Sequence, residues 1–532
     1  MPEIKSPIKL YNLVLQHLDI IQDNQRKVDI YNYSVDDFRP VLFQELLTNT
    51  RLILENQKIN NLSSMGVDVC ARVIIEICTL LWADKTNRFT DEQKKLFLLD
   101  YFGVEYNKMA QKDAPEELKE YLARPYNKII EEYMNILGCS KEEAIKIAEE
   151  RRAFLKYGGK RKYPTFLSFV LSILKVDYVE CREMINFFIH PSYTVFQKKA
   201  HNGTSLSSER ERIINKVLAL ASKNIPEIEN KEYVKSKWNN NYIDDDTQTI
   251  INNLKKYFKQ AYKNPFETRD YSEYWNESIL DNPETRNIIF SCIDRIKCTL
   301  IDILMCESFG LKTQVIARMK SIFEMISMVG KLLKSNNIDV DVDNFTTHSK
   351  IFITLKNQQI YSIIKKYDSG ESLDEREQKT INHYFEIIGE WYDEFKKTRD
   401  YPSSVEEFDK NIRLYPLYYL NPDPTYKYSK LFNEVLMNYI DNKKIQNEII
   451  NDYKWSAMLG HVSAYNSELR MNKAYRYIPN LLTYLISVLS IIDVSPSTEE
   501  LIDYLKFLVN EIRDNNRTKY EEDLSSKYKK LD

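Results

Sequence analysis

The sequence predicts an all-α protein made of two tandem copies of one multi-helix bundle, joined by a polar, partly helical connector. Three observations lead to this prediction. The 532 residues include only 11 glycines, roughly a third of average usage, and tight turns and hairpins need glycine. Apolar residues recur at helical spacing, without the alternation typical of strands. Short segments of the first half also recur, in the same order, in the second half.

The first half is predicted to consist of consecutive helices. Thr90 stands where an N-cap is expected, and Ser140 and Glu143 have the spacing of a capping box. Gly158 and Gly159 interrupt the helical pattern, and Pro191 ends a later helix because proline cannot continue one. Helices are expected at residues 7–22, 36–60, 66–84, 94–106, 116–155, 165–189 and 213–221.

A change of composition divides the chain. Residues 223–287 are polar and rich in Asn, Asp and Lys, and they are expected to connect two helical bundles with some helix of their own. The first bundle, with its N-terminal helices, is expected to span residues 1–222. The second is expected to span residues 288–532 and to end in a charged tail, with its helical pattern resuming near Ile288 and a buried helix at 481–492.

The proposed repeat depends on three matches whose offset grows along the chain, as insertions into the second copy would require. An offset of 248 places Arg72 and Glu76 on Lys320 and Glu324, 255 places residues 95–98 on 350–353, and 271 places His190-Pro191-Ser192 on His461-Val462-Ser463. The alternative explanation is that amphipathic helices of unrelated origin align loosely.

Each copy contains a charge pair inside an apolar helix. Arg72 precedes Glu76 by four residues, so the two side chains share a helix face. A charge pair among apolar neighbours costs free energy unless its partners satisfy it, so we expect Glu76 and Glu324 to be buried. Their expected partners are Arg72 and Lys320 respectively, or a nearby His. Together with a histidine, such a cluster is either an acid–base site or a polar network that fixes helix register. The candidate catalytic residues are Arg72, Glu76, Glu324, His190 and His461.

The net charge of −3 gives no global case for nucleic acid, but one segment is locally basic. Tyr157 and Tyr163 are interleaved with its cations, an arrangement that can hold a phosphate backbone and stack bases. A solvated loop is the alternative. The candidate nucleic-acid-binding residues are Arg151, Arg152, Lys156, Lys160, Arg161 and Lys162.

Several classes of protein lack support in the sequence. There is no HExxH, phosphate-binding loop, GxGxxG or Gly-x-Ser-x-Gly motif, so we expect neither a metal nor a cofactor. No apolar run reaches the roughly 18 residues of a membrane span, and the N-terminus lacks a signal-peptide pattern. The seven cysteines form no CxxC and most lie in apolar runs, which predicts buried, reduced thiols and a cytoplasmic location.

The Arg-x-x-x-Glu helix at Arg72 and Glu76, with a later helix ending in His190-Pro191-Ser192, resembles an uncharacterised group of bacterial all-helical proteins. That group is distantly similar to the HEPN superfamily, many of whose members are ribonucleases in toxin–antitoxin and phage-defence systems. The resemblance covers roughly residues 50–200 and, less closely, 295–495.

The chain departs from the catalytic HEPN pattern, in which four to six residues separate an Arg from a His. Seven residues separate Arg182 from His190, and eight helical steps turn the two side chains ~80° apart. Tyr453 stands at the matching place in the second copy. We therefore expect a non-catalytic binding or regulatory protein of a prokaryotic defence or toxin–antitoxin system, with a protein or RNA partner. The alternative is a divergent, metal-independent ribonuclease that acts as an abortive-infection toxin.

Overall fold

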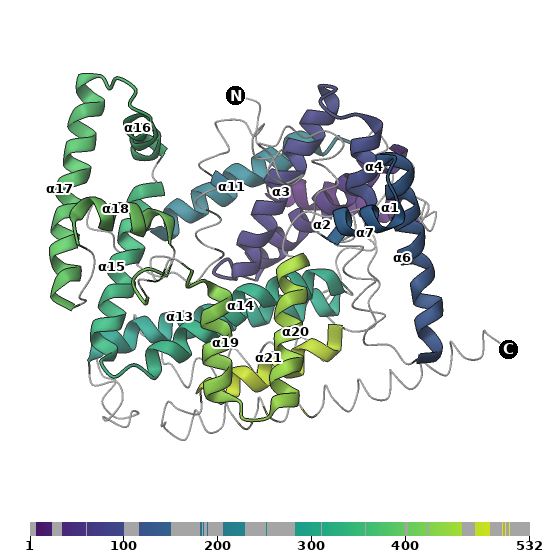
Figure 1. The fold of residues 1–532 in the computed structure, drawn as a ribbon. Coiled ribbons are helices and arrows are strands. Elements are labelled where there is room, and N and C mark those ends of the chain that lie inside the picture. The colour runs from purple at the N-terminus through teal and green to yellow at the C-terminus, as the bar shows by residue number, and fades with distance from the viewer. Residues whose placement is uncertain are drawn as a thin grey trace.

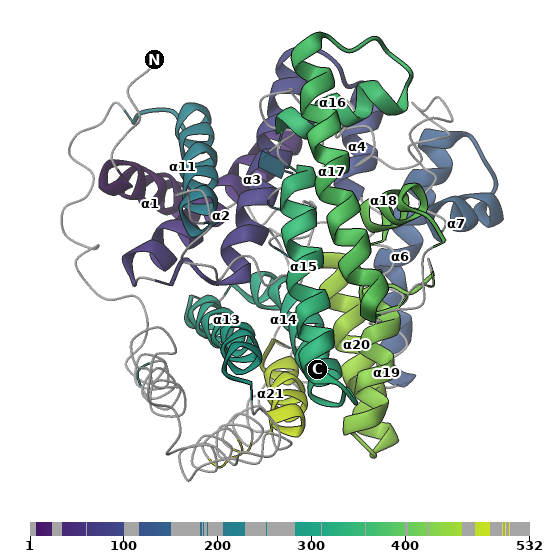
Figure 2. The same cartoon turned by 90° about the vertical axis from the view of Figure 1, so that its left-hand side faces the viewer.

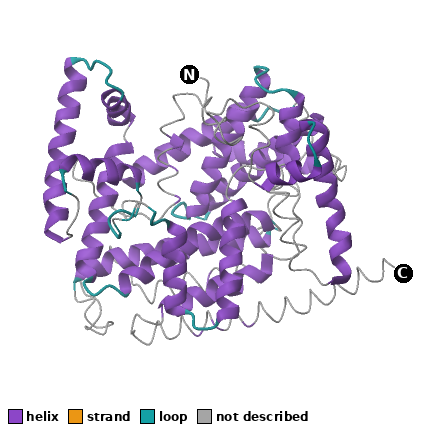
Figure 3. Ribbon diagram, in the orientation of Figure 1, coloured by secondary structure: helices purple, strands orange, loops and turns teal. Residues whose placement is uncertain are grey.

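The described part of the chain is helical, as the sequence predicts. The computed structural model describes residues 7–23, 35–59, 61–99, 116–149, 206–228, 282–309, 311–356, 358–398, 403–415, 417–421, 425–459 and 474–489, with single positions at 181, 182, 185, 189, 252, 423, 503, 506 and 510. Within these residues there are 16 α-helices, one short 3-10 turn and no strand (Figure 3). The all-α prediction is confirmed for this part of the protein.

The described helices of the first half overlap their predicted ranges, but the stretch 116–155 is divided into two helices and the helix predicted at 213–221 begins at Leu206. They are α1 (Pro7–Asp23), α2 (Phe38–Lys58), α3 (Met65–Lys85), α4 (Asp91–Leu99), α6 (Glu116–Leu137), α7 (Lys141–Glu149) and α11 (Leu206–Asn224). Local capping explains where several begin. Ser64 Oγ accepts from the Gly66 amide at 2.9 Å at the start of α3. Thr90 and Gln93 form a reciprocal capping box before α4.

The described helices of the second half are α13 (Pro283–Ser308), α14 (Lys312–Leu333), α15 (Ile338–Lys356), α16 (Gln358–Asp368), α17 (Glu375–Thr398), α18 (Val405–Leu414), α19 (Tyr428–Tyr439), α20 (Lys443–Leu459) and α21 (Ala474–Leu489). The helical pattern resumes at Pro283 rather than near Ile288, because proline is tolerated in the first turn of a helix. Most of the predicted connector, and nearly all of the predicted charged tail, lie outside the described residues.

Two helices, α3 and α14, form the centre of the molecule. Helix α3 packs against α2, α11, α13 and α14, and α14 packs against α13, α19, α20 and α21 as well. Figure 1 shows α14 below α3, with α19, α20 and α21 around it. A single hydrophobic core contains residues of both halves, from Leu10 in α1 to Leu489 in α21. The two predicted bundles therefore share one core.

Smaller groups of helices flank this centre. A separate apolar cluster joins α4, α6 and α7 through Leu96, Ile130 and Ile147 respectively. On the opposite side of the molecule, α15 to α18 form a projecting group (Figures 1 and 2). Arg413 of α18 pairs there with Asp409, at 2.6 Å, and with Asp368 of α16, at 2.8 Å.

Two further sequence expectations can be compared with the described residues. Among the described helices, none combines the length and the apolar composition needed to cross a bilayer. All seven cysteines lie in the described part and carry thiols. Six of them are buried and Cys139 is half-buried, so the predicted burial of most thiols is confirmed.

Candidate functional site

The carboxylate of Glu76 lies in the protein core. Its side chain is fully buried on α3, and Arg182 Nη2 lies 3.2 Å from Glu76 Oε1. Arg182 is itself 7% exposed and belongs to the segment that leads toward His190 in the sequence. The guanidinium of Arg182 is therefore paired with a buried carboxylate.

Glu324 of α14 has a similar position in the second half. It is 1% exposed and accepts a hydrogen bond from the Tyr453 hydroxyl of α20 at 3.0 Å. The Tyr453 ring stacks on Phe432 of α19, with 4.3 Å between the ring centroids. Burial, together with the charge of Glu324, raises the pKa of Tyr453 far above its ordinary value, so the phenol stays protonated and donates to the carboxylate.

Arg72 is influenced by both carboxylates. Burial lowers the pKa of its guanidinium and the charge of Arg182 adds to this, whereas the charges of Glu76 and Glu324 act in the opposite direction. The predicted burial of Glu76 and Glu324 is confirmed. Lys320 is half-buried and forms no ion pair with Glu324, which instead accepts from Tyr453. The alternative partner, a nearby His, lies outside the described residues. The polar partners of Glu76 and Glu324 described above, Arg182 and Tyr453, come from segments distant in the sequence.

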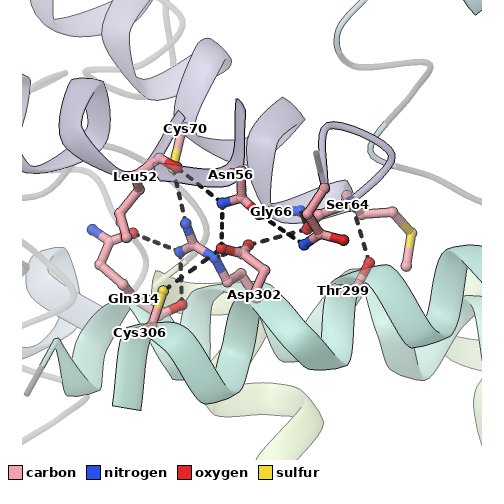
Figure 4. Close-up of polar contacts among 12 residues, drawn as sticks. Leu52, Asn56, Ser64, Gly66, Cys70, Thr299, Asp302, Cys306 and Gln314 are labelled. Carbon is pink, nitrogen blue, oxygen red and sulfur yellow. Dashed lines mark hydrogen bonds and ion pairs between the residues drawn. The ribbon is translucent and has the colours of Figure 1, made fainter. Parts of the chain in front are cut away.

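A second buried polar layer lies nearer the start of α3 and centres on Asp302 of α13 (Figure 4). Arg318 Nε of α14 lies 2.5 Å from Asp302 Oδ2, and both side chains are fully buried. Two further contacts to this carboxylate come from the first half: Asn56 Nδ2 donates at 2.7 Å and Ser64 Oγ at 3.1 Å. Asp302 thus connects the second half to the end of α2 and the start of α3.

The backbone of α3 at Gly66 passes very close to the side chains of Asp302 and Arg318. A Cβ atom at Gly66 would lie 1.7 Å from Asp302 Oδ2 and 2.5 Å from Arg318 Nε. Only glycine therefore fits where α3 begins beside this ion pair. Asn61 completes the corner, since its Nδ2 donates to the Cys298 carbonyl at 2.9 Å.

Asp68, one turn further along α3, holds two arginines. Arg210 of α11 donates to its two oxygens at 2.8 and 2.9 Å. Arg295 of α13 donates to Oδ2 at 3.0 Å. Burial lowers the pKa of Arg295 to about 10, and the charge of Asp68 opposes this shift. Asp68 therefore joins helices from both halves.

Four residues of these layers are absent from the candidate residues predicted from the sequence: Asp68, Asp302, Arg295 and Arg318. The same signal that identified Glu76 was available, because Asp302 stands in the apolar run Leu300–Leu304. Their pairing could not be predicted, since each partner comes from a helix distant in the sequence.

The remaining predicted site residues lie outside the described part of the chain. They are His190 and His461 and the basic residues Arg151, Arg152, Lys156, Lys160, Arg161 and Lys162. Where side chains are described, no group of three or more His, Cys, Asp or Glu is arranged to hold a metal ion. The described side chains of Arg72, Glu76, Arg182 and Glu324 are all buried.

Comparisons of the chain with models of known protein families, with curated proteins and with solved structures find no significant match.

Proposed function

We propose that the chain is a non-catalytic binding or regulatory protein built from two copies of one helical unit, acting in a prokaryotic defence or toxin–antitoxin system with a protein or RNA partner. The main observation in favour is the burial of the candidate acid–base groups. Glu76 and Glu324 are 0% and 1% exposed, and a general acid or base must come within hydrogen-bond distance of its substrate.

The duplication is supported by equivalent contacts. The offset of 248 matches Glu76 to Glu324, and the offset of 271 matches Arg182 to Tyr453. Arg182 contacts Glu76, and Tyr453 contacts Glu324. Matched residues thus make matched contacts, although the residue types differ at one position. In the same way, α11 packs on α3 and α21 packs on α14.

The ion pair of Arg182 favours binding over cleavage. Cleavage of the HEPN type needs a cation that stabilises charge on the phosphoryl group beside a histidine that acts on the 2′-hydroxyl. Arg182 is nearly buried and paired with Glu76, and breaking such a pair costs ~3–5 kcal/mol. Arg182 could contact an RNA phosphate only if this ion pair were broken, at that cost in free energy.

The test is to incubate the purified protein with total cellular RNA and a chelator, and to follow both RNA length and electrophoretic mobility. We expect the RNA to stay intact. A charge-reversal variant, Lys160→Glu with Arg161→Glu and Lys162→Glu, should weaken any mobility shift if RNA is the partner. An RNA that stays both intact and unshifted would point to a protein partner.

Variants of the two histidines make the test decisive. Cleavage by the parent protein that is lost in His190→Ala or His461→Ala, but kept in His383→Ala, would overturn the proposal and identify a ribonuclease. His383 is a suitable control because it is an exposed histidine on α17, with 73% of its side chain accessible.

A further inference from the structure

A cleft of about 710 Å³ lies at the C-terminal end of α14. Its walls come from the last turn of α14, the turn into α15, the end of α17 and one face of α19. Three of its lining residues are lysines: Lys331, Lys334 and Lys397. The volume lies within the range of small-molecule sites, roughly 300–1,000 Å³.

The positive charge of this cleft is only partly neutralised. Lys331 pairs with Glu434. Lys334 Nζ instead donates to the Asn438 carbonyl at 2.7 Å and lies 4.2 Å from the centroid of the Tyr439 ring. Among the described residues no carboxylate pairs with Lys334. Its ammonium group is held in place by an uncharged acceptor and an aromatic ring, so no partner carboxylate neutralises its charge.

The two carboxylates of the lining are already engaged. Glu434 accepts from the Tyr426 hydroxyl at 2.6 Å as well as from Lys331. Asp341 accepts from Ser335 Oγ at 2.6 Å. Lys397 pairs with Glu394 at 2.6 Å, but that pair is about two-thirds exposed, and an exposed pair is easily rearranged. The uncommitted groups of the cleft are therefore mainly donors.

The wall of the cleft is built by close packing rather than by loose side chains. The Tyr439 hydroxyl donates to the Gly330 carbonyl at 2.6 Å. A Cβ at Gly330 would lie 2.8 Å from Val435 Cγ1 and 3.2 Å from Tyr439 Cε2. Glycine thus lets α19 come close to the end of α14, which fixes Tyr439 and, through the ring contact, Lys334.

We propose that this cleft binds a phosphorylated small molecule of about nucleotide size. Ammonium groups and carboxamide N–H groups are suitable donors to phosphate oxygens, and charge-assisted hydrogen bonds are the stronger kind. Asn336 and Asn438 line the same cleft and add such carboxamides. The site goes beyond the proposed function and does not depend on it, because it uses none of the candidate RNA-binding or histidine residues.

The test is isothermal titration of the full-length protein with ATP and, separately, with inorganic triphosphate. We expect the parent protein to bind at least one of these probes. Loss of one charge-assisted hydrogen bond weakens binding by about tenfold or more, so Lys334→Gln should show that loss. Lys397→Gln should weaken binding in the same direction.

A matched control separates this cleft from other basic surfaces. Lys379→Gln removes an exposed lysine of α17 whose pair with Glu375 lies outside the cleft, and it should keep the parent affinity. Absence of binding by both probes would overturn the proposal. Parent-like affinity in both Lys334→Gln and Lys397→Gln would also overturn it, because the anion would then bind elsewhere. Circular dichroism of each variant confirms that the helices are intact.

Discussion

Arg318 donates a hydrogen bond from Nη2 to the Sγ atom of Cys70, at 2.9 Å, across 248 positions of sequence. The same interval of 248 matches Glu76 to Glu324. Helix α3 carries Cys70 and α14 carries Arg318, so this contact lies where the two helices pack against each other.

The polar layers on either side of this contact, one around Glu76 and one around Asp302, are buried. A buried ion pair is weak support for stability, because desolvation offsets much of the attraction, but removing one partner is strongly destabilising. We therefore regard Asp68, Asp302 and their arginines as groups that specify how the halves pair.

Gly66→Ala should destabilise the protein by ~3–5 kcal/mol, the typical cost of breaking a buried pair. The new Cβ would overlap Asp302 Oδ2 at 1.7 Å, so Asp302 must leave Arg318 or α3 must shift. Urea unfolding followed by circular dichroism measures the change. Gly389→Ala in α17 is the matched control, since no atom lies within 4 Å of its new Cβ. The idea fails if both variants are as stable as the parent.

Glu76→Ala should lower the melting temperature clearly, because it leaves the guanidinium of Arg182 in the core without its carboxylate. The expected cost is ~3–5 kcal/mol. Glu375→Ala on α17 is the control, as its pair with Lys379 is largely exposed and should matter little. A Glu76→Ala protein that melts with the parent would show that the core does not need this ion pair.

Glu76 and Gly66 also show how much of this core could be predicted from the sequence. The burial of Glu76 was predictable because its neighbours along the helix, Val73 to Ile75 and Ile77, are apolar, and that is local information. The partners of the buried carboxylates were not predictable. The four-residue spacing indicated Lys320 for Glu324, whereas the contact comes from Tyr453, 129 residues away. Gly66 was unremarkable in the sequence because its constraint comes from Asp302 on another helix.

Cys139, the one half-buried cysteine, should react first with an aromatic disulfide reagent. Cys139 is half-buried, whereas the other six thiols are buried. Burial also raises the pKa of Cys70, Cys292 and Cys298 to about 12, and the thiolate is the reactive form. At pH 8 we expect one fast thiol per native chain, absent from Cys139→Ser, and seven in denaturant. Two or more fast thiols in Cys139→Ser would contradict the described core.

Stability should fall as pH rises from weakly acidic to weakly alkaline conditions, and Glu45 of α2 should contribute to the slope. Its carboxyl is 2% exposed, and Asn49 Nδ2 donates to it at 3.3 Å. Burial raises the pKa of Glu45 from 4.5 to about 8, while the hydrogen bond from Asn49 acts in the opposite direction. The folded protein keeps this proton where the unfolded chain has released it.

The sign of the effect follows from proton binding. Between pH 4.5 and about 8 the folded state binds more protons than the unfolded state, so the free energy of unfolding decreases with rising pH. The stabilisation from the protonated carboxyl is fully present below pH 4.5 and is lost progressively as pH rises toward the folded pKa.

Glu45→Gln keeps a neutral group of the same shape, so the stability of this variant should depend less on pH. Urea unfolding of the parent, Glu45→Gln and the exposed control Glu375→Gln, at intervals from pH 5 to pH 9, tests this. Parallel curves for the parent and Glu45→Gln would mean that Glu45 is already ionised in the folded protein.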